Sequence, residues 1–248
     1  ALIPLSEDAG LWPVLVAVAS GMLRTAAVII MLDSLKRQEV SQVIPVVYTY
    51  PIFVAIIAVP LLGESLNCLE WLAIVIVMLG AVVVSVKQMP SGSINWHGRV
   101  LLLFGSSLLF AVADIASKYA LAYISFWNMF WISAFCMSAI FLSISARPHF
   151  VKQLINIKQR NSTMVMIVFN ETLAPLGIVL SFWALERGFV SLVSTIISSR
   201  PMFVLIFALI LNRLSPAFLE WHASKGMLAI RIIAVAMIVG GIAIIHLV

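Results

Sequence analysis

The chain has 248 residues, of which 63% are hydrophobic and only 10% are charged, with a net charge of +5. Ordinary soluble domains carry about 25% charged residues, and the mean hydropathy here is +1.14. These values exclude a soluble fold and predict an all-α transmembrane protein, because helices satisfy their own backbone groups in lipid. The positive charge does not indicate nucleic-acid binding, since basic residues of membrane proteins mainly mark the loops that face the cytoplasm.

Eight apolar segments are long enough to predict membrane-spanning helices. In chain order they are Leu11–Leu32, Val40–Leu62, Leu69–Val86, Val100–Tyr123, Phe126–Ala146, Met164–Leu185, Val190–Leu211 and Met227–Leu247. A polar turn is expected at Asp33–Glu39, and Pro90–Ser93 is the best candidate for a linker between two halves. In the basic loop 147–160, apolar residues at helical spacing predict a short helix on the bilayer surface.

The second and seventh predicted spans are copies of each other. Pro51 matches Pro201 (201 − 51 = 150), and the same offset pairs Leu69-Glu70-Trp71 with Leu219-Glu220-Trp221. Spans one to three therefore correspond to spans six to eight. Equivalent helices lie five crossings apart, and five is odd, so the second copy must cross the membrane in the opposite sense. Such inverted-topology repeats are typical of secondary transporters.

The two copies are unequal, because the second contains five predicted spans and the first only three. We therefore expect a ten-span inverted-repeat (5+5) fold. Residues 1–92 would be the C-terminal three spans of the first repeat, and residues 93–248 would be the complete second repeat. The two missing spans and the absence of an initiator methionine indicate a fragment or a processed form.

Three features resemble the repeat of EamA-like carriers of the drug/metabolite transporter superfamily. They are the proline-broken helix, the Leu62-Gly63-Glu64 ending and a glycine in the following helix. The resemblance implies two inverted five-helix halves and a transport activity. In the second half Asn212-Arg213-Leu214 replaces the Leu-Gly-Glu ending, and extra residues from His222 to Arg231 precede the last helix. The gate at that end is therefore expected to differ from its relatives.

Ionisable side chains deep inside spans cost about 2.5–3.5 kcal/mol each on insertion scales, so each needs a partner or a water-filled cavity. Arg24 and Glu171 are expected at similar depth, as a substrate clamp that includes Asn170 or as a structural salt bridge. Asp114 and Lys118 lie four residues apart and could pair, although Lys118 is near enough to its span end to snorkel. Asp114 and Glu171 are the candidate proton carriers.

The remaining site candidates surround the two prolines. Pro51 and Pro201 cannot donate a backbone hydrogen bond, so each is expected to break its helix near mid-membrane. Beside these breaks lie the predicted substrate-binding residues Tyr48, Tyr50, Ser198, Ser199 and Arg200. The alternative is that both prolines only kink their helices for packing. Gly80 and Gly240 are expected to be close-packing positions.

These features favour a secondary transporter that moves a small polar metabolite by alternating access. The arginines weakly favour amino or organic acids as substrates, because guanidinium pairs well with carboxylate. The alternatives are an intramembrane enzyme, whose usual motifs are missing, and a membrane scaffold or channel. No catalytic residue, cofactor, metal or nucleic-acid partner is expected. The expected partners are the substrate and the lipid bilayer, and a monomer is plausible.

The distribution of charge predicts the orientation. Four loops with most of the basic residues share one face, and the opposite face carries Glu64 and Glu70. By the positive-inside bias the basic face is cytoplasmic, although the family resemblance implies the reverse. The expected location is a bacterial inner (cell) membrane, as a multi-pass protein.

Overall fold

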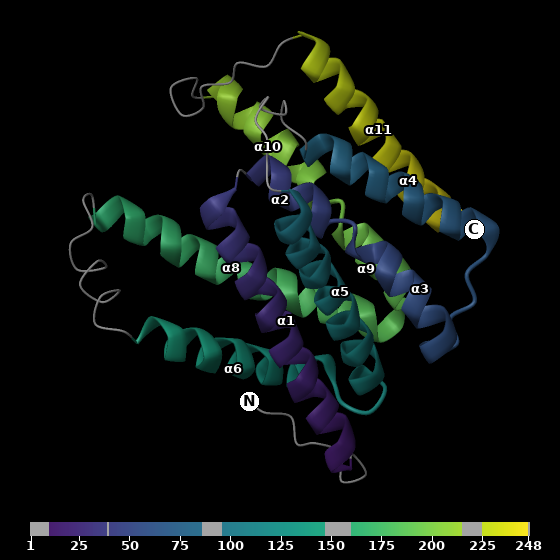
Figure 1. The fold of residues 1–248 in the computed structure, drawn as a ribbon, viewed down its shortest axis with the longest axis vertical. Coiled ribbons are helices and arrows are strands. Elements are labelled where there is room, and N and C mark those ends of the chain that lie inside the picture. Colours follow the sequence, from purple (N-terminus) through teal and green to yellow (C-terminus); the bar gives the residue numbers. More distant parts are fainter. Residues whose placement is uncertain (1–9, 39, 86–95, 147–159, 215–224, 248) are drawn as a thin grey trace. The chain divides into compact units, whose positions relative to one another are not determined.

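The computed structural model describes residues 10–38, 40–85, 96–146, 160–214 and 225–247, and every element within these ranges is an α-helix. The helices are α1 (Leu11–Arg37), α2 (Val40–Val47), α3 (Tyr50–Leu62), α4 (Cys68–Ser85), α5 (Trp96–Leu121), α6 (Phe126–Ser145), α8 (Arg160–Arg187), α9 (Val190–Ile197), α10 (Arg200–Leu214) and α11 (Lys225–Leu247) (Figure 1). The predicted linker Pro90–Ser93 and the surface helix expected within 147–159 lie outside the described residues.

Seven helical segments of the described chain are long and apolar enough to cross a membrane. An eighth, Cys68–Val84, is apolar but shorter. Together they correspond to the eight predicted spans. Seven such helices define a multi-pass integral membrane protein, since a helix of about 20 apolar residues spans the hydrocarbon core.

The first helix runs further than predicted. Helix α1 continues to Arg37 through the segment where a polar turn was expected. Arg37 Nε lies 3.2 Å from the Asp33 carboxylate, one helical turn earlier. An ion pair at this spacing supports a helix, and basic residues in its last turn suit the negative end of the helix dipole. The polar residues therefore extend α1 instead of ending it.

Two spans are each divided into two helices by a break of the same construction. In the first break, residues 48–49 separate α2 from α3, and in the second, residues 198–199 separate α9 from α10. Each new helix has a proline, Pro51 or Pro201, as its second residue, where the missing N–H costs no helical hydrogen bond. Just after the proline, Ile52 N donates to Thr49 O (3.2 Å) and Met202 N donates to Ser199 O (2.9 Å).

The helix bounds repeat along with the sequence. Helix α1 ends at Arg37 and α8 ends at Arg187, which is 150 residues later. Both bounds of α2 shift by 150 to give those of α9, and the starts of α3 and α10 differ by the same number. The duplicated sequence thus forms duplicated local structure.

The chain divides into two compact units, each described here by itself. The first unit comprises residues 1–25 and 116–188, and the second comprises residues 26–115 and 189–248. In the first unit α6 packs against α8 and against the start of α1. A Cβ on Gly21 would lie 3.1 Å from the Cys136 Cβ of α6, so this crossing requires a very small residue.

The second unit is built around the crossing of α4 and α11, which run side by side (Figure 1). A Cβ on Gly80 would lie 2.8 Å from Ile238 Cγ1, and a Cβ on Gly241 would lie 2.5 Å from Val77 Cγ2. The buried cluster around this crossing also includes α10 residues. Its members are Val77, Ala81, Val84, Met202, Leu205, Ala234 and Ile238.

The packing confirms one of the two predicted glycine contacts and corrects the other. Gly80 sits in the crossing, as expected, but Gly240 is exposed and has nothing within 4 Å of the place where a Cβ would be. One residue rotates about 100° around a helix, so the neighbour Gly241 faces α4 and Gly240 does not.

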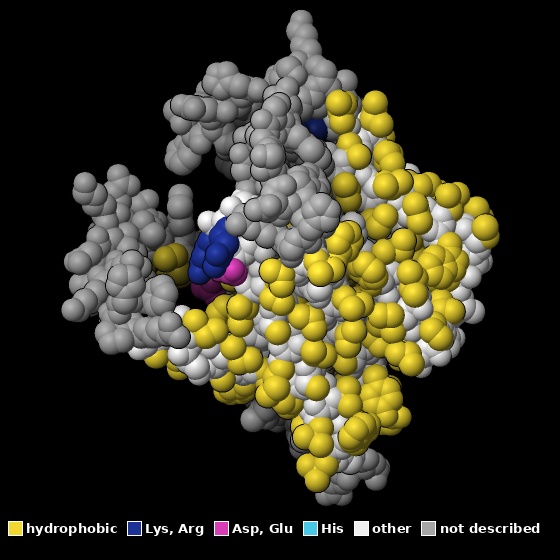
Figure 2. Space-filling model, in the orientation of Figure 1, with side chains coloured by type: hydrophobic (Ala, Val, Ile, Leu, Met, Phe, Trp, Pro, Cys, Tyr) yellow, Lys and Arg dark blue, Asp and Glu magenta, His cyan; other side chains and the backbone are white. Residues whose placement is uncertain are grey.

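Large apolar side chains are exposed along the helices, as Figure 2 shows for the visible face. Leu101, Phe135 and Val165 have exposed fractions of 71%, 67% and 70%. A soluble protein would not tolerate so continuous an apolar surface. A lipid-facing surface agrees with the lengths of the helices.

Candidate functional site

The second break follows a helix whose hydroxyl groups are buried. Ser191, Ser194, Thr195 and Ser198 of this segment are fully buried, and Ser199 is 3% exposed. The Ser198 hydroxyl donates to Thr195 O and the Ser199 hydroxyl to Ile196 O, both at 2.7 Å. Their protons therefore satisfy local carbonyls, while each hydroxyl oxygen keeps the capacity to accept a further hydrogen bond.

A side chain from α5 reaches the first break. The carbonyl of Val46 accepts from Thr49 N (3.2 Å), from the Thr49 hydroxyl (2.7 Å) and from the Ser107 hydroxyl (3.0 Å). Ser107 is fully buried. No sequence pattern singles out this serine, because only the fold brings α5 beside the break.

Tyr50 connects the first break to α9. Its side chain is 8% exposed, and its hydroxyl donates to Ser194 O at 3.2 Å. Its ring lies 6.2 Å from that of Phe110, centroid to centroid. Tyr50 thus joins α3, in the first copy of the repeat, to α9, in the second.

Arg200 is the first residue of α10, at the position that Tyr50 occupies in α3. Its side chain is exposed and lies near the side chain of Tyr48. Tyr48 itself packs on the buried cluster of α4, α10 and α11. The N-terminus of α10 adds the positive end of the helix dipole, so this dipole and the Arg200 cation lie at the same break.

Arg24 lies in a different environment, in the first unit. It donates to the Ser117 hydroxyl at 3.3 Å, and its guanidinium lies 5.4 Å from the centre of the Phe182 ring. Such stacking favours a cation by the electrostatics of the ring face. Glu171 is exposed and accepts from Asn170 at 3.4 Å. Within the described residues of this unit, the structure brings Arg24 to Ser117 and not into an ion pair with Glu171.

Lys118 has a role that the sequence did not indicate. Its ammonium donates to the carbonyls of Leu185 (2.8 Å), Glu186 (3.2 Å) and Gly188 (2.8 Å). These carbonyls end α8, where a cation also stabilises the helix dipole. Lys118 therefore caps a helix in addition to any other contact it makes. Asp114, one turn earlier, is 4% exposed.

Glu64 is a third residue whose role the sequence analysis did not identify. It is only 6% exposed, and its carboxylate accepts from Val190 N (2.5 Å), Ser191 N (3.3 Å) and the Ser191 hydroxyl (2.5 Å). It follows Gly63, whose φ of +67° is a conformation that glycine adopts without strain. The Leu62-Gly63-Glu64 motif was visible, but its long-range partner in α9 was not.

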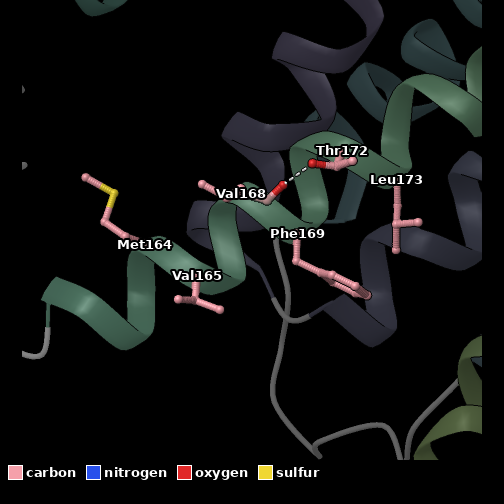
Figure 3. A pocket seen from close by; sticks show the side chains of 6 residues that line it. All are labelled: Met164, Val165, Val168, Phe169, Thr172 and Leu173. Atoms are coloured by element: carbon pink, nitrogen blue, oxygen red, sulfur yellow. Dashed lines mark hydrogen bonds between the residues drawn. The ribbon is translucent and has the colours of Figure 1, made fainter.

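One hollow of about 460 Å³ lies along α8 and is shown in Figure 3. It is lined by Met164, Val165, Val168, Phe169, Thr172 and Leu173. The Thr172 hydroxyl donates to Val168 O at 2.7 Å, so the lining offers no spare proton donor. This apolar hollow on one helix suits an acyl chain and not a polar substrate. The described residues contain no cluster of His, Cys, Asp and Glu that could hold a metal ion.

The sequence of residues 2–86 matches the model of the EamA-like transporter family. This match confirms the resemblance seen in the broken helix and the Leu62-Gly63-Glu64 ending. No curated protein matches the chain. Thirteen chains of solved structures resemble the fold. One of these chains comes from a crystal structure whose TM-score with this chain is 0.70 at 20% sequence identity. The match covers 100% of this chain and 78% of that chain. At this identity the likeness establishes the fold alone.

Proposed function

We propose that the protein is a secondary transporter that moves a small polar metabolite by alternating access. The observation that carries this proposal is the pair of broken spans, with breaks 150 residues apart and of the same construction. In transporters, broken helices supply free backbone groups and helix ends at mid-membrane, where the substrate binds. The family match over residues 2–86 supports the same class.

The α4–α11 crossing supports an inverted repeat. The two glycines lie 161 residues apart (241 − 80), and so do the residues they meet (238 − 77). Exchanging the two helices therefore turns the contact of Gly80 with Ile238 into that of Gly241 with Val77. A contact that maps onto itself in this way is the mark of a twofold axis. The offset exceeds 150 because of the extra residues before α11.

The bare face of α8 supports the ten-span form of this proposal. On α1, the Ala27 carbonyl accepts from Ser106 of α5 at 2.9 Å, and Ser20 is fully buried. The α8 positions 150 residues later are Gly177 and Asn170, and both are exposed. Nothing lies within 4 Å of a Cβ placed on Gly177. A helix that repeats α5 would cover this face, and together with a helix that repeats α6 it would give two halves of five helices.

The charges at the second break favour an anionic substrate. Arg200 and the N-terminus of α10 both attract a carboxylate, and the hydroxyl oxygens of Ser198 and Ser199 can accept from an amino group. We therefore place amino and organic acids first among substrates. Asp114 and Glu171 remain the candidates for proton coupling, the first buried and the second exposed.

Counterflow into liposomes tests this function. Purified full-length protein is reconstituted with one unlabelled amino or organic acid inside, and uptake of the labelled compound is measured across a panel. Saturable uptake that requires the internal compound is the expected result. Saturable counterflow of cations alone would contradict the anionic substrate class. Flux that does not saturate would indicate a channel, and chemical conversion of the compound would indicate an enzyme.

A further inference from the structure

The start of α9 is held by an acid from a distant part of the chain. The carboxylate of Glu64, which follows α3, accepts from the first two backbone N–H groups of α9 and from the Ser191 hydroxyl. The residue in front of the helix, Phe189, has no side chain that could cap it. Glu64 therefore accepts the helix-start N–H groups that an N-cap residue would normally accept. Its negative charge also suits the positive end of the helix dipole.

Helix α9 depends on such contacts because it is short. It has eight residues and is followed directly by the break. Isolated helices of this length are marginal, since the cost of nucleation is spread over few hydrogen bonds. Two polar contacts from the ends of α3 add to the packing of α9 on α3 and α4. One is the carboxylate of Glu64 at its start, and the other is the Tyr50 hydroxyl on Ser194 O.

The position equivalent to Glu64 in the other copy of the repeat is not an acid. The counterpart of Glu64 is Leu214 (214 − 64 = 150), and the counterpart of Val190, at the start of α9, is Val40, at the start of α2. A leucine side chain has no hydrogen-bond acceptor. Position 214 therefore cannot supply to α2 the carboxylate that position 64 supplies to α9.

We propose that Glu64 is a one-sided latch, a positioning residue that docks α9 on α3 and whose release opens that end of the transport path. Only the opening of the transport path rests on the proposed function. The latch itself is a contact between the Glu64 carboxylate and the start of α9. Because α9 leads directly into Arg200, movement of α9 also moves the cation at the second break.

The accessibility of the α9 start tests the latch without a transport assay. In full-length protein lacking Cys68 and Cys136 (both changed to Ser), Val190→Cys places a thiol at a fully buried position of α9. Adding Glu64→Gln should raise its rate of reaction with a water-soluble maleimide about tenfold, because charge-assisted caps are lost. Ser191→Ala removes one donor and should give a smaller rise.

Glu70→Gln is the matched control. The Glu70 carboxylate accepts from Asn67 N at 2.7 Å and caps the start of its own helix α4. This change should leave the thiol at position 190 unchanged. Equal rises in the Glu64 and Glu70 variants, or no rise in the Glu64 variant, would overturn the proposal.

A reporter in the first unit separates local release from general loosening. Cys136 is retained alone in a parallel set of variants, and its reaction rate should not change. If Glu64→Gln raises the reaction rates at both position 190 and Cys136, the Ser191→Ala variant is compared next. A rise at position 190 alone in that variant supports the latch, and no such rise contradicts it. Normal counterflow with unchanged labelling of position 190 in the Glu64→Gln variant would contradict the latch and leave the proposed function standing. The expected labelling without counterflow of any compound would sink only the proposed function.

Discussion

At the scale of single residues, the two breaks have the same backbone arrangement but different side chains. Tyr50 and Arg200 each begin the second half of a broken span. Tyr50 is buried and donates to a carbonyl of α9, whereas Arg200 is exposed and lies near Tyr48. The first break is therefore tied into the fold, and the second presents a cation. A substrate with one charged end would meet that asymmetry directly.

Replacing Arg200 should impair transport without unfolding the protein. Arg200→Lys keeps the charge but loses the planar fork of donors, and Arg200→Ala removes both. Hydrogen bonds to charged groups contribute about 1.5–3 kcal/mol, so the alanine variant should lose roughly 10- to 100-fold in counterflow rate, and the lysine variant less. Rates are compared at matched expression, with Arg187→Lys as the control. Wild-type rates and affinity in Arg200→Ala would leave this arginine with a structural role only.

Replacing Lys118 should instead lower stability. Lys118→Met leaves three carbonyls at the end of α8 without their cation. We expect a loss of about 2 kcal/mol in the free energy of unfolding, since charge-assisted hydrogen bonds are the strong ones. Thermal unfolding in detergent measures it, with Lys36→Met at the exposed end of α1 as the control. Equal unfolding temperatures for the two variants would show that the cap contributes little.

At the scale of elements, neighbouring glycines of α11 provide a matched pair for the α4 crossing. Gly241→Ala and Gly80→Ala would each place a Cβ closer than 3.0 Å to atoms of the facing helix. Overpacking of this kind typically costs about 1–3 kcal/mol. Gly240→Ala meets nothing within 4 Å, and alanine is the better helix former. The unfolding temperature of the Gly240→Ala variant should stay level or rise, while those of the Gly80→Ala and Gly241→Ala variants fall. The same loss in all three would mean that the crossing is not tight.

The sequence predicted those elements whose signals are local. Apolar runs set the spans, and Pro51 and Pro201 lie one residue after the starts of α3 and α10 because a proline acts on its own turn. The polar segment after Leu32 was misjudged, since the Asp33–Arg37 pair keeps the helix going. Gly241 was missed in favour of Gly240, because the repeat register alone does not show which side of α11 faces α4.

The site was less predictable than the spans for a related reason. The partners of Glu64 and Lys118 are 126 and 67 residues away. No spacing pattern reports contacts at such separations. Repeat matching did bring Tyr50 and Arg200 to equivalent places, but only the packing distinguishes the buried tyrosine from the exposed arginine.

At the scale of the whole molecule, the native cysteines can report the orientation in the membrane. Cys68 is exposed in the same short segment as Glu64 and Glu70, on the face predicted to lie outside the cell. In cells expressing Cys136→Ser, an impermeant maleimide should label Cys68. Lys36→Cys, in protein lacking both native cysteines, should react only after the membrane is permeabilised. The opposite pattern would establish the orientation that the family resemblance implies.

The crossing of α4 and α11 has the form of a homodimer contact held within one polypeptide. In a true homodimer every substitution appears on both sides of the axis, so neither half could gain an arginine without its partner gaining one too. In the proposed inverted repeat, joining both copies in one chain removes that restriction. One half can then keep Tyr50 and Glu64 while the other carries Arg200 and Leu214. Gly80 and Gly241 stay matched because both sides of the α4–α11 contact need a glycine, and the residues away from this contact are free to diverge.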